Sequence, residues 1–168
     1  RHGIPASKLY NLVFIALIAG VIGARLVYAL RFPAAFIASP LSLFSLNPGV
    51  LDAMGAVVVG TIAFLAYAKR SNLQLWSTLD ALTPGLAVLM IALGASHYAS
   101  GSAFGAPTSL PWSISLWGET RHPSQVYEIL AAAAVLALLW PGKERLKARQ
   151  PGDYFLNFIA LSAAARLL

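Results

Sequence analysis

The sequence predicts an all-α, polytopic integral membrane helix bundle, with about five transmembrane helices and an interfacial loop on the outer side. Of its 168 residues, 58% are hydrophobic and only 11% are charged, whereas soluble domains carry about 25% charged residues. The mean hydropathy is +0.71. Apolar runs long enough to cross a hydrocarbon core of about 30 Å recur along the chain. We therefore expect a single transmembrane domain over residues 1–168.

Five apolar runs give the expected helices in order, at about residues 9–30, 50–68, 79–98, 125–140 and 154–168. The connection after the first run contains three prolines and is expected to lie at the membrane interface. The second run ends at Lys69 and Arg70, which separate it from the third. Segment 99–124 is rich in glycine, proline and tryptophan, so it is expected to be a second loop at headgroup level. A basic connection separates the last two runs.

The net charge of +6 is explained by membrane topology rather than by nucleic-acid binding. The positive-inside rule places the basic connections in the cytoplasm. Alternate threading then puts eight basic residues inside: Arg1, Lys8, Lys69, Arg70, Lys143, Arg145, Lys147 and Arg149. Only Arg31 and Arg121 fall in the opposite loops. The basic residues would also attract anionic lipid headgroups.

The composition also limits the chemistry. The chain contains no cysteine, which excludes a disulfide framework, a thiolate nucleophile and thiolate metal ligands. Its sequence shows no metal-ligand spacing, glycine-rich phosphate loop or nucleophilic triad, so we expect neither a metal nor another cofactor. Because it begins without an initiator methionine and ends inside an apolar run, we expect a fragment or the ordered part of a longer membrane protein.

The densest polar feature is the string Arg121-His122-Pro123-Ser124-Gln125-Val126-Tyr127-Glu128. It places three titratable groups and a tyrosine within eight residues of an apolar chain, and this density is typical of a site. A purely structural interpretation is a capped helix start, with Ser124 as the N-cap and Tyr127 and Glu128 in the first turn. That role leaves Arg121 and His122 unexplained and is compatible with a site.

This string resembles the RHPSQLYE signature of the prolipoprotein diacylglyceryl transferase family. Three shorter segments agree in order with other motifs of that family: Gly23–Tyr28, Leu79–Pro84 and Phe104–Thr108. They resemble a GGR-x-x-Y segment at a helix end, a D-x-x-(A/L)-P helix start and a (W/Y)-G-x-P-T loop. The resemblance covers almost the whole chain, and only the eight-residue string is specific by itself.

The resemblance implies transfer of a diacylglyceryl group from phosphatidylglycerol to the lipobox cysteine of a secreted precursor, at the outer face of the bacterial inner membrane. It implies a phospholipid site formed by Arg25, Arg121, Ser124, Tyr127 and Glu128, and catalytic residues His97, His122 and Arg166. Arginine forks can hold a phosphate, and a histidine can assist thiolate formation. The expected partners are phosphatidylglycerol or another anionic phospholipid, together with a lipoprotein precursor or a larger membrane complex.

The sequence also departs from the family pattern. Leu51-Asp52-Ala53-Met54-Gly55 stands where the family has its HGG motif, and Gly94–Ser102 is shorter than the family's central motif and lacks its arginine. An alternative is therefore a catalytically degenerate member that acts as a lipid-binding or structural subunit. A small transporter or channel is a third possibility, and the absence of acidic residues deep in a span argues against it.

Three of the expected site residues also have a purely structural interpretation. Arg25 can extend to the interface or pair with Asp52. Arg166 can pair with Glu128 or Glu119, and His97 can serve only as an interfacial hydrogen-bonding group.

Overall fold

The computed structural model describes residues 3–38, 48–116, 118–140 and 150–165. Its five longer helices are α1 (Ala6–Arg31), α3 (Ala53–Arg70), α4 (Leu75–Ala99), α5 (Ser124–Leu139) and α6 (Asp153–Ala165). Shorter elements are α2 (Pro33–Ala38), the 3₁₀ turn η2 (Pro48–Val50) and strands β1 (Ile114–Leu116) and β2 (Glu119–Arg121). These elements form two compact units, divided at Thr78 and Leu79.

The predicted all-α membrane fold is confirmed. In the described residues, α1, α3 and α4 are long and apolar enough to cross a membrane, while α5 and α6 are shorter apolar helices. At a rise of 1.5 Å per residue, the 16 residues of α5 extend about 24 Å. Many large apolar side chains of these helices are exposed, as expected for surfaces that face lipid.

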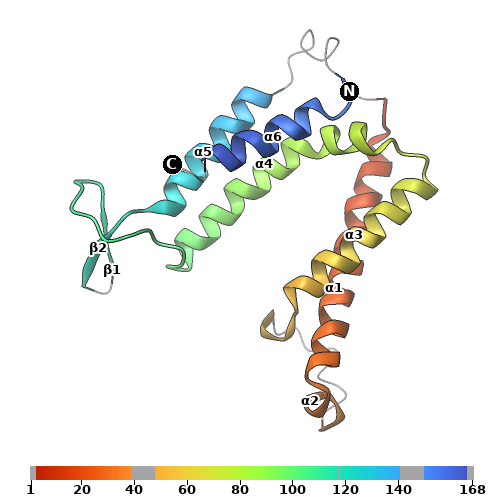
Figure 1. The fold of residues 1–168 in the computed structure, drawn as a ribbon, viewed down its shortest axis with the longest axis horizontal. Helices are drawn as coiled ribbons and strands as arrows, with labels where there is room; N and C mark the ends of the chain where they lie inside the picture. Colours follow the sequence, from red (N-terminus) through yellow and green to blue (C-terminus); the bar gives the residue numbers. More distant parts are fainter. Residues whose placement is uncertain (1–2, 39–47, 117, 141–149, 166–168) are drawn as a thin grey trace. The chain divides into compact units, whose positions relative to one another are not determined.

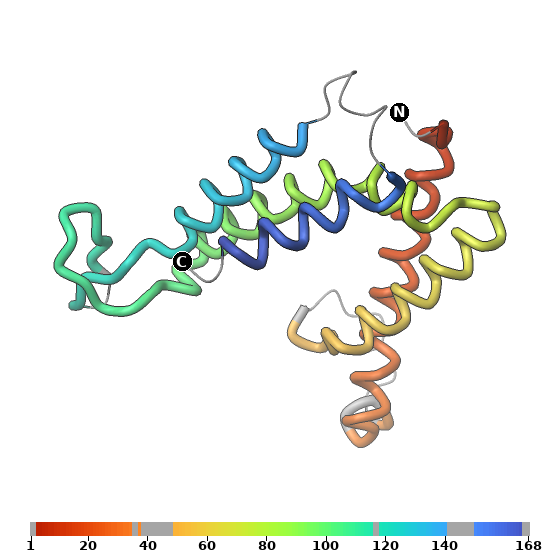
Figure 2. The backbone as a smooth tube through the Cα atoms, turned by 45° about the horizontal axis from the view of Figure 1, so that its top comes forward, coloured from red at the N-terminus to blue at the C-terminus, as the bar shows by residue number. Residues whose placement is uncertain are grey.

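In the first unit, α1 and α3 lie side by side and antiparallel (Figures 1 and 2). Glycines allow their backbones to approach closely. A Cβ added to Gly20 would lie 3.2 Å from the carbonyl oxygen of Ala56, and one added to Gly60 would lie 3.6 Å from the Cα of Gly20. Small residues at such contacts are the usual basis of helix packing in membranes, because lipid offers no hydrophobic gain for association.

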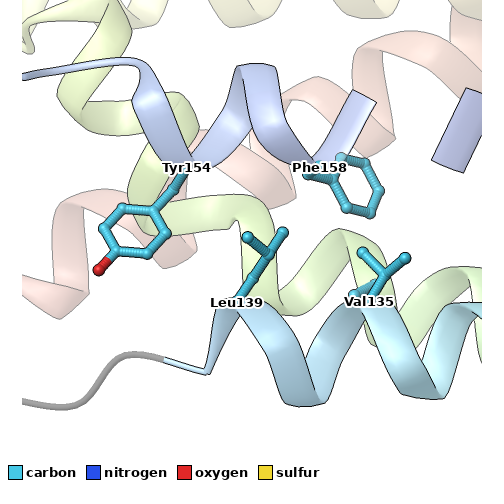
Figure 3. Close-up of a cluster of buried hydrophobic side chains, with 5 residues drawn as sticks. Val135, Leu139, Tyr154 and Phe158 are labelled. Atoms are coloured by element: carbon cyan, nitrogen blue, oxygen red, sulfur yellow. The ribbon is translucent and has the colours of Figure 1, made fainter. Parts of the chain in front are cut away.

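In the second unit, α4, α5 and α6 lie side by side (Figure 2). Val135 and Leu139 of α5 face Tyr154 and Phe158 of α6 (Figure 3), and Ala87 of α4 completes this buried cluster. The connection from α4 to α5 extends beyond the helices and carries the β1–β2 hairpin (Figure 1). This hairpin was not expected, because its strands have three residues each and no alternating apolar pattern.

The third helix begins earlier than expected, and this places the buried carboxylate of Asp80 inside it. We expected this helix to begin near Leu79, but α4 begins at Leu75, so Asp80 lies within the helix. Its side chain accepts hydrogen bonds from the backbone amides of Gly152 (2.7 Å) and Phe155 (2.9 Å). Asp80 therefore caps the first turn of α6, where the amides lack partners in their own helix.

Candidate functional site

The polar string lies where the α4–α5 connection returns to α5. Before the string, the segment Gly105–Thr108 pairs with the end of β2. The amide of Gly105 donates to the carbonyl of His122 (3.0 Å), the amide of His122 donates to Ala106 (3.1 Å), and Thr108 donates to Thr120 (2.9 Å). A Cβ on Gly105 would lie 2.8 Å from the Cβ of His122. Pairing on both edges of β2 therefore holds Arg121 and His122 on a defined backbone.

Ser124 and Gln125 fasten this backbone to the end of α4. The hydroxyl of Ser124 donates to the carbonyl of Ala103 (2.5 Å). The side-chain Nε2 of the fully buried Gln125 donates to the carbonyl of Ser102. The structural interpretation of Ser124 as N-cap was wrong. Pro123 occupies the cap position of α5 and makes no side-chain cap bond, because the Ser124 hydroxyl is engaged by the loop.

His122 and Tyr127 are in direct contact. Nδ1 of His122 lies 3.2 Å from the hydroxyl oxygen of Tyr127, and their rings meet edge to face at a centroid distance of 6.1 Å. The same hydroxyl accepts a hydrogen bond from the indole nitrogen of Trp112 (2.8 Å). A chain of three polar aromatic groups thus joins the loop, the end of the hairpin and the first turn of α5.

Arg121 is paired within its own strand. Its Nη2 lies 2.7 Å from Oε2 of Glu119. Residues two apart in a strand lie on the same face, which explains this contact. The Arg121 side chain is 36% exposed and the Glu119 side chain is 58% exposed. Part of the Arg121 side chain is therefore accessible to solvent.

The backbone of His97 is joined to the same corner through Ser102. The carbonyl of His97 accepts from the amide of Ser102 (3.0 Å), whose own carbonyl accepts from Gln125. Two buried side-chain atoms here, Nδ1 of His97 and Oε1 of Gln125, have no hydrogen-bond partner among the described residues. Glu128 is exposed on α5. The structure thus brings His97, Arg121, His122, Ser124 and Tyr127 to one end of the second unit.

Arg25 belongs to the first unit. Its Nη1 donates to the carbonyl of Val50 (3.3 Å). The alternative pairing of Arg25 with Asp52 was wrong, since Asp52 is paired with Arg31 at 2.6 Å and also accepts from the amide of Gly55 (2.7 Å). Arg31 is the last residue of α1, from which it reaches the start of α3.

Arg166, the remaining expected site residue, lies outside the described residues. Within the described ranges, His, Asp and Glu side chains do not gather in groups of three that could hold a metal ion.

Two residues of this corner were not assigned a site role from the sequence. Trp112 lies 15 positions before Tyr127, and no spacing rule connects residues across an irregular loop. Glu119 was considered only as a partner for Arg166, although its two-residue spacing from Arg121 fits the strand period.

Known proteins resemble this chain along its whole length. The family model of prolipoprotein diacylglyceryl transferase matches residues 1–168. A phosphatidylglycerol–prolipoprotein diacylglyceryl transferase of Bordetella parapertussis is 32% identical over 138 residues, which are 79% of this chain and 53% of the relative. The enzyme of the same name from Synechocystis is 31% identical over 151 residues, 83% of this chain and 53% of the relative. That from Trichormus variabilis is 29% identical over 99% of this chain and 64% of the relative. The chain thus spans about half the length of the first two relatives.

Proposed function

The chain belongs to the prolipoprotein diacylglyceryl transferase family, and we propose that it transfers a diacylglyceryl group from phosphatidylglycerol to the lipobox cysteine of a lipoprotein precursor. The substrates follow from the names of its relatives. In this reaction the thiol loses its proton to a base and the sulfur attacks the glyceryl carbon bonded to the phosphate oxygen. The carbon–oxygen bond breaks, and its electron pair leaves with glycerol phosphate.

The polar corner of the second unit contains the groups that this chemistry needs. Arg121 is an accessible cation for the phosphate that leaves, and an arginine stays charged in a lipid environment. His97 or His122 is the base for the thiol. Tyr127 and Glu128, which are exposed, contact the headgroup, and Ser124 supports this surface through its bond to Ala103. We also infer that Arg25, which lies in the first unit, binds phospholipid and that Arg166 acts in the chemical step.

One observation carries the proposal. The string that resembles the family signature folds into a polar surface at the end of apolar helices, with Arg121 and His122 adjacent and both partly accessible. A merely structural helix start would use Ser124 as a cap, and α5 does not. The position of this surface at a helix end fits the depth of lipid phosphates, since the helices themselves are apolar.

We place the protein in the bacterial inner membrane as a multi-pass protein with the polar string on the outer face. Within the first unit, Lys8 Nζ donates to the carbonyl of Ser71 (3.0 Å), so the start of α1 and the end of α3 share one end of the helix pair. Lys69 and Arg70 lie at that end. Clustering of these basic residues supports a cytoplasmic orientation for it.

A transfer assay tests the proposal. The protein, phosphatidylglycerol vesicles and a lipobox peptide are incubated together, and mass spectrometry should show a peptide heavier by one diacylglyceryl group. We expect Arg121→Gln to lower the rate about a hundredfold or more, as loss of a charge-stabilising donor does. Arg70→Gln removes the same charge from the exposed end of α3 and should keep the rate. If the unmodified protein produces no mass shift, the proposal is overturned. If the protein binds phosphatidylglycerol but transfers nothing, the result indicates the alternative of a catalytically degenerate member.

A further inference from the structure

Trp112 lies outside the polar string but is bound to it. Its indole nitrogen is 2.8 Å from the Tyr127 hydroxyl oxygen, and that oxygen is 3.2 Å from Nδ1 of His122. The indole is 58% exposed and Tyr127 is 40% exposed, so this chain of groups is not part of a packed core. Burial of apolar area therefore does not explain why the three side chains meet.

The directions of these hydrogen bonds follow from the chemistry of each group. An indole N–H can only donate, so the oxygen of Tyr127 is the acceptor in the first bond. The hydroxyl hydrogen of Tyr127 is then available to donate. Among the described residues, Nδ1 of His122 is the acceptor within its reach. A neutral imidazole that accepts at Nδ1 carries its own hydrogen on Nε2.

We propose that Trp112 is a positioning residue, which acts through Tyr127 to hold His122 in the tautomer with its hydrogen on Nε2. His122 then presents a donor to a bound group, and it is not the base at that nitrogen. In the opposite tautomer, Nδ1–H would compete with the indole N–H for the one in-plane lone pair of the Tyr127 oxygen, and the hydroxyl hydrogen would have no acceptor among the described side chains. Without the indole N–H, that lone pair is free to accept from Nδ1–H. The net value of one hydrogen bond corresponds to a preference on the order of fivefold.

This inference rests on the proposed function and assigns separate roles to His122 and His97 in it. When the carbon–oxygen bond breaks, the electron pair stays on the phosphate oxygen, and an Nε2–H donor stabilises the charge that develops there. The thiol proton must then go to another group. His97 is the other histidine at this end of the second unit, where its backbone carbonyl accepts from the amide of Ser102, and we assign the role of base to its imidazole. Two histidines would thereby carry opposite roles, one as donor and one as base.

The tautomer can be measured without substrate. Protein with ¹⁵N-labelled histidine in lipid nanodiscs gives separate Nδ1 and Nε2 signals in NMR spectra, and His122→Gln assigns those of His122. We expect the Nε2–H tautomer in the unmodified protein. Trp112→Phe keeps an aromatic ring but removes the donor, so it should raise the ratio of Nδ1–H to Nε2–H by a factor on the order of five. Trp140→Phe is the matched control, since Trp140 is equally exposed at the end of α5.

Two spectroscopic results would overturn the inference: a predominant Nδ1–H tautomer in the unmodified protein, or identical His122 signals in Trp112→Phe and Trp140→Phe. The transfer assay adds a kinetic readout. Trp112→Phe should lower kcat in proportion to the lost fraction of the Nε2–H tautomer, which is a decrease of roughly 1.7-fold when a fivefold preference disappears. KM for phosphatidylglycerol should stay nearly unchanged, because a positioning role acts on the chemical step. Equal kcat values for the two variants would also contradict it.

The two proposals fail separately. If the spectra follow the expected pattern but the protein transfers no diacylglyceryl group, the proposed function is overturned and the positioning of His122 by Trp112 is retained. If transfer occurs but the tautomer does not respond to Trp112→Phe, the positioning role is overturned and the proposed function stands.

Discussion

Arg121 has an internal competitor for any phosphate that binds it. Oε2 of Glu119 lies 2.7 Å from Nη2 of Arg121, so a phosphate would have to replace the carboxylate or bind the other guanidinium nitrogens. Exposed ion pairs of this kind contribute little free energy, because water screens both charges. Glu119 can therefore hold the side chain of Arg121 in place and still yield to a more highly charged ligand.

Replacement of Glu119 by glutamine should strengthen lipid binding. Glu119→Gln removes the competing charge, and we expect the Kd for a short-chain phosphatidylglycerol to fall about twofold to fivefold, the range set by an exposed pair. Isothermal titration calorimetry on the solubilised protein measures it. Glu144→Gln makes the same change of charge elsewhere in the chain. An equal fall of Kd in both variants would show a general charge effect and contradict the competition.

At the level of single residues, the sequence predicted the string but not its contacts. Arg121, His122 and Tyr127 were predicted as site residues from their density, and this role stays a prediction. In the structure His122 contacts Tyr127, and Arg121 is paired with Glu119. The contact of Trp112 with Tyr127 depends on the path of an irregular loop, which no periodic pattern encodes. The expected pairing of Asp52 with Arg25 was wrong for a similar reason. Both Arg25 and Arg31 lie in the last turns of α1, and only the geometry of the helix shows that Arg31 is the one that reaches Asp52.

The α1–α3 pair depends on glycines that leave no room for a side chain. A Cβ on Gly23 would lie 2.4 Å from the Cβ of Val59, and one on Gly55 would lie 2.7 Å from that of Val27. Neither distance is sterically possible, so the helices would have to separate. Because association in lipid depends on close packing, a small separation loses many contacts at once.

Gly23→Ala should therefore destabilise the protein. We expect a loss of about 1–3 kcal/mol from overpacking, seen as a lower midpoint of thermal unfolding in detergent. Gly85→Ala is the control, because nothing lies within 4 Å of a Cβ at that position of α4. It should be neutral or stabilise by up to about 1 kcal/mol through helix propensity. Equal midpoints for the two variants would show that the close approach of α1 and α3 does not contribute.

Asp80 connects two helices through a cap rather than through packing. Its two oxygens accept from the amides of Gly152 and Phe155 at the start of α6, and Asp80 is only 4% exposed. Asp80→Asn leaves one acceptor oxygen for two amides. We expect a loss of about 1–3 kcal/mol and faster hydrogen exchange at the Phe155 amide. Asp153→Asn is the control, since its carboxylate accepts from the exposed amide of Gln150 and should cost less than about 1 kcal/mol.

The helices could be predicted because apolar length alone defines them in a membrane protein. The first and fourth expected spans agree with α1 and α5 to within three residues at either end. The start of α4 was missed because Leu75–Thr78 contains polar residues that continue the helix beyond its apolar run. Strands β1 and β2 were missed because backbone pairing, of β2 with β1 on one edge and with Gly105–Thr108 on the other, holds them rather than side-chain alternation.

At the scale of the whole molecule, charge and apolar surface are separated along the helices. The first unit has Lys8, Lys69 and Arg70 at one end of its helix pair and the Arg31–Asp52 pair at the other. In the second unit the polar string lies at the end where α4 stops and α5 starts (Figure 1). This separation could be predicted from the order of basic loops, since alternate spans must reverse direction. The fold of the connection between α4 and α5 could not be predicted, because the threading of the spans restricts only its depth.

The proposed sidedness can be tested by placing single cysteines in a chain that has none. Ser115→Cys introduces a thiol at an exposed position of β1, and Gln74→Cys introduces one at an exposed position between α3 and α4. In intact spheroplasts, a membrane-impermeant maleimide should label Ser115→Cys at once and label Gln74→Cys only after lysis. The substrates lie at the outer face in the proposed reaction, so the hairpin beside Arg121 and His122 must be accessible there. Labelling of Gln74→Cys alone in intact spheroplasts would reverse the topology and place the polar string on the wrong side of the membrane for lipidation of a secreted precursor.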